Sequence, residues 1–170
     1  MKLDPSDVKL FKDNGFLVLD NIINNDDALE SITVAELLSE QLADAFSCRA
    51  ESSQCGQYLS LANQNRALAS SVFDSLVKIP LVQRICYSHK LHLIAQQLLE
   101  SSLVLASPTQ MNLRSDFPEE KKHLYPWHRD YDYNFSSSNS LVFWIPLQDV
   151  DETNGSLHYI PAVSYTHLRA

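Results

Sequence analysis

The sequence predicts an α+β fold, with helices in the first hundred residues and short strands after them. Two observations support this prediction. Residues 5–99 contain apolar residues at helical spacing between capping residues. From Leu103 onward, short apolar runs are interrupted by Pro and Gly, which is typical of antiparallel strands. Helices followed by strands is the α+β order, and we expect one domain over residues 1–162, helical to residue 100 and β from residue 103.

Length and composition are those of one soluble domain. The chain has 170 residues, of which 45% are hydrophobic and 20% are charged. A net charge of -8 argues against nucleic acid or an anionic membrane as partner, because both attract clustered Lys and Arg. No apolar run reaches the length of a membrane span, and the N-terminus lacks the apolar core of a signal peptide. The three cysteines fit no zinc spacing and are read as free thiols, so we expect a cytoplasmic protein.

The first predicted helix begins at Pro5 and ends near Gly15. Asp4 offers a capping carboxylate, Pro5 suits the first helical position, and Gly15 suits a left-handed residue at the end. Residues 16–19 are apolar and are predicted to form a buried strand.

A longer helix is predicted from a cap at Asp26 or Asp27 to about Phe46. Apolar residues near helical spacing predict which face meets the core. They are Leu29, Ile32, Ala35, Leu38, Leu42 and Phe46. Residues 48–57 are polar and predict a loop, whereas residues 58–77 are compatible with a helix.

Two more helical regions are predicted before the strands. Pro80 starts the first, and Ser88 caps the second, which ends near Leu99. His89 and His92 lie three residues apart on that helix. We interpret them as solvated or capping residues rather than metal ligands, because no third ligand is predicted nearby.

The second part of the chain is predicted to consist of short strands. Their ranges are 103–105, 109–113, 126–130, 140–147 and 156–160. Residues 140–147 are apolar on both faces, as expected for a strand inside a sandwich or barrel. The pair Asn154 and Gly155 predicts a turn between the last two strands.

His128 and Asp130 are the candidate metal ligands. On a strand, residues two positions apart point to the same face, so both side chains can converge on one ion. A His and an Asp are two of the three ligands in the 2-His-1-carboxylate triad that binds non-haem Fe(II). Taken alone, this two-residue pattern is weak, and a polar strand end is the alternative interpretation.

Several spaced motifs resemble the phytanoyl-CoA dioxygenase family of Fe(II)- and 2-oxoglutarate-dependent oxygenases. The first is Trp127-His128-Arg129-Asp130. Further matching stretches are residues 14–19, 142–147, 151–157 and 160–161. They follow the family's order along most of the chain.

This resemblance implies a double-stranded β-helix (jelly-roll) core with the helices packed outside it. It implies that His128 and Asp130 are the first two iron ligands. Four further residues are expected to line the 2-oxoglutarate pocket or to flank the iron, with plain sheet packing as the alternative for each. They are Gln110, Asn112, Trp127 and Tyr131.

The implied reaction is hydroxylation of an aliphatic C–H bond of a small organic molecule. Dioxygen is the oxidant, and 2-oxoglutarate is decarboxylated to succinate. Tyr131, Tyr133 and Phe135 would shield an apolar substrate from water. Two alternatives stay open: a cupin-type metalloprotein that does not use 2-oxoglutarate, and a non-catalytic jelly-roll binding domain.

The last residues depart from the family pattern. After Pro161 the family continues with a Gly-Ser-His turn and strands that carry the third ligand. Here, residues 163–170 read as a translated sequencing adapter, hence a non-native tail. Neither His158 nor His167 is expected to be the third ligand. We therefore expect a C-terminally truncated fragment with weak iron binding, no turnover and unpaired strand edges that favour aggregation.

Overall fold

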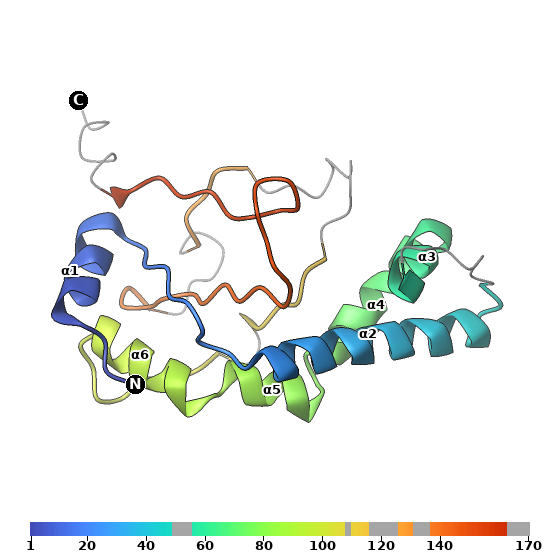
Figure 1. Cartoon of the computed structure of the whole chain (residues 1–170), viewed down its shortest axis with the longest axis horizontal. Helices are drawn as coiled ribbons and strands as arrows, with labels where there is room; N and C mark the ends of the chain where they lie inside the picture. The colour runs from blue at the N-terminus through green and yellow to red at the C-terminus, as the bar shows by residue number, and fades with distance from the viewer. Residues whose placement is uncertain (49–55, 108–109, 116–125, 131–136, 163–170) are drawn as a thin grey trace. The chain divides into compact units, whose positions relative to one another are not determined.

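The structure is a computed structural model whose regular elements are helices (Figure 1). It describes residues 1–48, 56–107, 110–115, 126–130 and 137–162. The helices are α1 (Pro5–Asn14), α2 (Asn25–Ala45), α3 (Gly56–Gln64), α4 (Arg66–Leu76), α5 (Pro80–Cys86) and α6 (His89–Leu98). No helix of these residues is long and apolar enough to cross a membrane.

The chain divides into two compact units. The first unit comprises Met1–Ile22, Tyr87–Ser107 and Pro118–Ala170, and the second unit comprises Ile23–Cys86 and Pro108–Phe117. The single domain expected over residues 1–162 stays a prediction.

The described residues contain no β-strand, so the predicted jelly-roll core is wrong. A strand needs a neighbouring strand to pair with its N–H and C=O groups. Beyond Ser101, the backbone–backbone hydrogen bonds of the described chain lie in one turn, where the Asp151 carbonyl accepts from Asn154 and Ser156. The apolar pattern therefore identified segments suited to an extended conformation, but these segments have no neighbouring strand to form hydrogen bonds with.

The helix predicted at the N-terminus is confirmed as α1. Asp4 accepts a hydrogen bond from the Ser6 backbone N–H at 3.0 Å, and Asp7 accepts from the Asp4 N–H at 3.3 Å. This pair of bonds is a capping box. Gly15 ends the helix at φ 81°, and its N–H donates to the Phe11 carbonyl at 2.8 Å.

The core of the first unit joins α1, α6 and the segment between α1 and α2. Leu3, Ile94 and Leu98 are buried in it. Partly buried side chains pack against these three: Val8, Phe11, Leu17, Leu19, Ile22 and Leu141. Residues 16–19 thus contribute to a core as predicted, but as irregular chain rather than as a strand.

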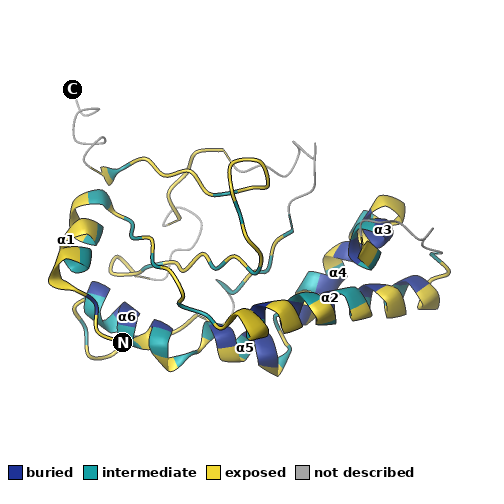
Figure 2. Ribbon diagram, in the orientation of Figure 1, coloured by how far each residue is buried: buried dark blue, intermediate teal, exposed yellow. Residues whose placement is uncertain are grey.

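The core of the second unit lies among α2, α3 and α4. Its buried residues are Ala35, Ala43, Tyr58, Leu61, Ala62, Ala69, Val72 and Leu76. Leu61, Ala69 and Val72 have no exposed surface. The buried residues of the described chain lie on the helices, apart from Leu3, whereas the described residues from 137 to 162 are exposed or half-buried (Figure 2).

The predicted inward face of α2 is confirmed in the middle of the helix, where Ala35 is buried and Leu38 and Leu42 pack against the core, but not near its two ends. Leu29 and Phe46, both expected inside, are 65% and 62% exposed. The buried residues of α2 are small: Ala28, Ser31, Ala35, Ser39 and Ala43. Small side chains let the neighbouring helices approach α2 closely. The close packing of these helices therefore decides which residues of α2 are buried more than the size of the apolar side chain does.

The two buried serines of α2 have their hydroxyl groups satisfied within the helix. Ser31 Oγ donates to the Asp27 carbonyl at 2.8 Å, and Ser39 Oγ donates to the Ala35 carbonyl at 2.7 Å. A buried hydroxyl that finds such a partner avoids the cost of desolvation. These residues therefore fit an apolar interface despite being polar.

Side chains outside each helix determine where the helices begin. Asn24, rather than the predicted Asp26 or Asp27, caps α2 by accepting from the Asp26 N–H at 3.1 Å. Asn65 divides the region predicted as one helix and caps α4. Ser88 caps α6 as predicted.

The start of α3 depends on a carboxylate from α2. Glu36 Oε2 accepts hydrogen bonds from the backbone N–H groups of Gln57 at 2.5 Å and Tyr58 at 3.0 Å. Gly56 adopts φ 80°, and a Cβ atom there would lie 2.8 Å from Glu36 Oε1. Glycine therefore permits the close approach, and Glu36 compensates N–H groups that have no partner within the helix.

Candidate metal centre

The two predicted metal ligands lie side by side. Residues 126–129 have no regular secondary structure and Asp130 is helical, so the strand predicted here is wrong. His128 Nε2 nevertheless lies 3.4 Å from Asp130 Oδ1. The two side chains are 27% and 54% exposed, respectively. The imidazole and the carboxylate therefore form a pair that is partly exposed to solvent.

A hydrogen bond at Nδ1 of His128 determines the tautomer of the imidazole ring. His128 Nδ1 lies 2.7 Å from the Pro126 carbonyl oxygen, which can only accept. Nδ1 therefore carries a hydrogen; in the neutral ring Nε2 presents its lone pair to the carboxylate, whereas in the protonated ring the Nε2–H donates to it. Two such electron-rich atoms repel each other unless a proton or a cation lies between them.

The distance between the two side chains of the pair suits two ligands of one metal ion. Imidazole nitrogen and carboxylate oxygen bind divalent metals at roughly 2.0–2.2 Å, so two donors at a right angle lie about 3 Å apart. The observed 3.4 Å is close to that separation. A backbone carbonyl that holds the other ring nitrogen is the usual partner of a metal-binding His. The described residues contain no converging group of three His, Cys, Asp or Glu, and His167 lies outside them.

The charge of Asp130 acts on Tyr159, a residue that the sequence did not link to this pair. Burial raises the pKa of the Tyr159 phenol, and the negative charge of Asp130 raises that pKa further. The Tyr159 ring also stacks on the Phe16 ring, with the centroids 4.7 Å apart and an interplanar angle of 13°. Phe16 lies in the matching stretch 14–19, but no local pattern predicts its contact with Tyr159, because that contact joins distant parts of the chain.

Three of the other predicted site residues belong to the described part of the chain: Gln110, Asn112 and Trp127. Trp127 is 68% exposed. Gln110 and Asn112 belong to the second unit, where Asn112 Nδ2 donates to the Gln110 carbonyl at 3.4 Å. Tyr131 lies outside the described residues, as do Tyr133 and Phe135. The roles of these residues stay predictions.

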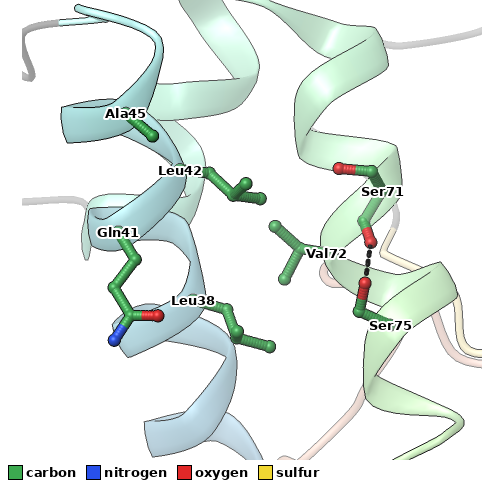
Figure 3. A pocket seen from close by; sticks show the side chains of 7 residues that line it. All are labelled: Leu38, Gln41, Leu42, Ala45, Ser71, Val72 and Ser75. Carbon is green, nitrogen blue, oxygen red and sulfur yellow. Dashed lines mark hydrogen bonds between the residues drawn. The ribbon is translucent and has the colours of Figure 1, made fainter.

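The second unit contains a hollow of about 320 Å³ whose lining has no acidic, basic or thiol side chain (Figure 3). Its lining residues come from α2 and α4: Leu38, Gln41, Leu42, Ala45, Ser71, Val72 and Ser75. The hydroxyl of Ser71 donates to the Leu68 carbonyl, and that of Ser75 donates to the Ser71 carbonyl. With no titratable side chain in its lining, the hollow is not the reactive site.

The described cysteines do not add a reactive group. Cys48 and Cys86 are free thiols, as predicted. Burial raises the pKa of the Cys86 thiol, which keeps it in the unreactive protonated form. Cys55 lies outside the described residues.

One comparison with known proteins gives a match. The model of the family described as phytanoyl-CoA dioxygenase (PhyH) matches residues 11–169, which is nearly the whole chain. No curated protein and no solved structure matches it. The matched family consists of oxygenases, which act on small molecules and use dioxygen. The chain belongs to the phytanoyl-CoA dioxygenase family.

Proposed function

We propose that this protein is an Fe(II)- and 2-oxoglutarate-dependent dioxygenase that hydroxylates an aliphatic C–H bond of a small organic molecule. The observation that carries this proposal is the His128–Asp130 pair, with its donor atoms 3.4 Å apart. Membership of an oxygenase family supports an oxidative reaction. The residue types support iron, because an imidazole and a carboxylate are two of the three ligands in the facial triad.

His128 and Asp130 have distinct roles in this proposal. His128 binds Fe(II) through Nε2, and the Pro126 carbonyl holds the ring in the required tautomer. Asp130 binds through Oδ1, the oxygen nearest to that nitrogen. Its negative charge offsets one of the two positive charges of the metal.

Bound iron and 2-oxoglutarate supply the oxidation that amino-acid side chains cannot perform. In the overall reaction, one oxygen atom of O₂ enters the substrate as a hydroxyl group and the other enters succinate, with release of CO₂. The protein's part is to hold the reactants and exclude competing water. Gln110 and Asn112 are proposed to line the co-substrate pocket, and Trp127 and Tyr131 to flank the iron.

The test is anaerobic titration of the 170-residue chain with Fe(II), with and without 2-oxoglutarate, carried to a large excess of Fe(II) because weak iron binding is expected. We expect a visible charge-transfer band that requires both components, because 2-oxoglutarate chelates iron through its keto and carboxylate oxygens. His128→Ala should abolish the band. His92→Ala is the matched control, since His92 is an exposed histidine of α6.

Three outcomes distinguish the proposal from its alternatives. A band that requires both components and His128 supports it. Metal binding that depends on His128 but is unaffected by 2-oxoglutarate indicates a different metalloprotein and contradicts the proposed reaction. Equal metal binding by the wild type and His128→Ala indicates that the pair is an ordinary ion pair, and contradicts the metal site itself.

A further inference from the structure

The sequence contains two Asn-Gly pairs, and the structure places them in different surroundings. Asn14 is the last residue of α1, and Gly15 follows it. Asn154 and Gly155 belong to the turn formed by residues 152–155. The two glycines have similar backbone angles, with φ of 81° and 100° respectively. The glycine conformation therefore does not distinguish the pairs, whereas their hydrogen bonds and their exposure do.

An Asn-Gly pair can deamidate without any other protein group. The glycine N–H loses its proton to hydroxide, and the nitrogen forms a bond to the side-chain carbonyl carbon of the asparagine. The bond from that carbon to Nδ2 breaks, and ammonia leaves a cyclic succinimide. Water then opens the ring to aspartate or isoaspartate, with no oxidation or reduction. Glycine favours the reaction because it has no Cβ atom to hinder the attack.

The helix restrains the glycine nitrogen that follows Asn14. Gly15 N–H donates to the Phe11 carbonyl at 2.8 Å, in the bond that ends α1. Val8 and Phe11 also pack this helix against the core of the first unit. Attack by the Gly15 nitrogen therefore requires the end of α1 to open first, and this opening costs a hydrogen bond. The fold should slow the reaction at Asn14.

The glycine nitrogen that follows Asn154 has no such restraint. The Asp151 carbonyl accepts from the N–H groups of Asn154 at 3.3 Å and Ser156 at 3.1 Å, on either side of Gly155. The Gly155 N–H itself donates to no atom of the described residues. Residues 151–155 are exposed, so their movement uncovers no core. The nucleophile of the reaction is therefore available in the folded chain.

The side-chain amide of Asn154 is also polarised for attack. Its Oδ1 accepts a hydrogen bond from the Asp151 N–H at 2.7 Å, and its Nδ2 donates to the Asp149 carbonyl at 2.8 Å. Attack on the amide carbon places negative charge on Oδ1, and a donor that already faces this oxygen stabilises that charge. Both bonds lie at the surface, where water can replace them.

We propose that Asn154 is a deamidation site of this protein and that α1 protects Asn14 from the same reaction. The product at position 154 has a carboxylate in place of the amide, so it cannot donate to the Asp149 carbonyl. The turn then loses one of the hydrogen bonds that close it, and the chain becomes more acidic. This inference is independent of the proposed metal site.

The test follows deamidation of the 170-residue chain at mildly alkaline pH, once in buffer and once in concentrated guanidinium chloride. Digestion with pepsin at low pH, where the reaction is slow, separates the peptides that contain Asn14 and Asn154. Mass spectrometry of these peptides gives a rate for each site. Asn14→Ser and Asn154→Ser are matched variants, because each removes one reactive amide and keeps a small polar side chain. Ion exchange of the intact chain detects the added negative charge.

In buffer, we expect Asn154 to deamidate about tenfold faster than Asn14, the factor that corresponds to one hydrogen bond that must first open. In guanidinium chloride, the two rates should agree within about twofold, because the unfolded chain has lost the restraint of α1. Asn154→Ser should remove the more acidic form that accumulates in buffer. Asn14→Ser should accumulate that form at the wild-type rate.

Four other outcomes would contradict the inference. The first is a rate in buffer at Asn14 that equals or exceeds the rate at Asn154. The second is the same preference for Asn154 in buffer and in guanidinium chloride, which would mean that neighbouring side chains rather than the fold set the rates. The third is an acidic form that still accumulates in Asn154→Ser, and the fourth is an Asn154 that reacts only in guanidinium chloride.

Discussion

The helical part of the chain, residues 1–100, and the described residues after it differ in how their apolar side chains are covered. Every buried residue of the described chain lies in the helical part, and all of these except Leu3 lie on a helix. After residue 100, Leu105 is 83% exposed and Val142 is 56% exposed. A helix satisfies its backbone hydrogen bonds internally, whereas an extended segment needs a partner. Regular secondary structure and buried side chains therefore occur together in the helical part, where backbone hydrogen bonds join residues close in sequence.

The largest expected effect comes from the same substitution made in each part. Leu61 has no exposed surface, so Leu61→Ala should lower the free energy of unfolding by about 2–5 kcal/mol. Leu105→Ala should change it by less than about 0.5 kcal/mol, because that side chain is already in water. Urea unfolding followed by circular dichroism measures both. A similar loss in the two variants would contradict the difference in burial.

A smaller effect is expected from the contact between α2 and α3. Glu36→Ala removes the acceptor of two backbone N–H groups, and should cost about 1–2 kcal/mol, as for other capping residues. Glu40→Ala, one turn further along α2 at an exposed position, is the matched control. Equal unfolding midpoints in urea for these two variants would mean that Glu36 does not stabilise α3.

The smallest effect compares two exposed carboxylates, one in each part. Hydrogen bonds from Ser6 lower the pKa of Asp4, and those from Thr153 lower the pKa of Asp151. A lowered pKa in the folded state gives stability that is present above the unfolded pKa and is lost as pH falls through the folded pKa. Asp4→Ala should therefore lower the melting temperature slightly at neutral pH and have no effect in strong acid.

Asp151→Ala should change the melting temperature less than Asp4→Ala at neutral pH. Asp151 orders a turn whose residues are exposed, whereas Asp4 caps a helix that packs on a core. Thermal unfolding at both pH values tests this. A larger shift for Asp151→Ala would show that the turn contributes to the cooperative unit.

The helix signals that could be read correctly from the sequence are those that act within a few residues. Asp4, Gly15 and Ser88 end or begin helices as predicted, because capping joins a side chain to backbone two or three positions away. The inward face of α2 was predicted only in part, since Ala35, Leu38 and Leu42 meet the core but Leu29 does not. Hydrophobicity favoured Leu29, but the space beside α3 and α4 is suited to residues as small as Ala35 and Ser39.

The strands and the full site depend on partners that are distant in sequence, and there the sequence is less informative. The i, i+2 spacing predicted the approach of His128 to Asp130, although an irregular segment rather than a strand achieves it. Nothing local indicated that Tyr159 and Phe16 would stack, or that the charge of Asp130 would act on Tyr159.

The central claim is that His128 and Asp130 bind one metal ion, and anaerobic equilibrium dialysis against Fe(II) tests it most directly. The account predicts weak but saturable binding that approaches one Fe(II) per chain at high Fe(II) concentration, for the wild type and for Asp149→Asn, an exposed aspartate used as control. It predicts at least tenfold weaker binding for Asp130→Asn, which loses the charge but keeps the shape. Equal Fe(II) binding by Asp130→Asn and Asp149→Asn would contradict the claim.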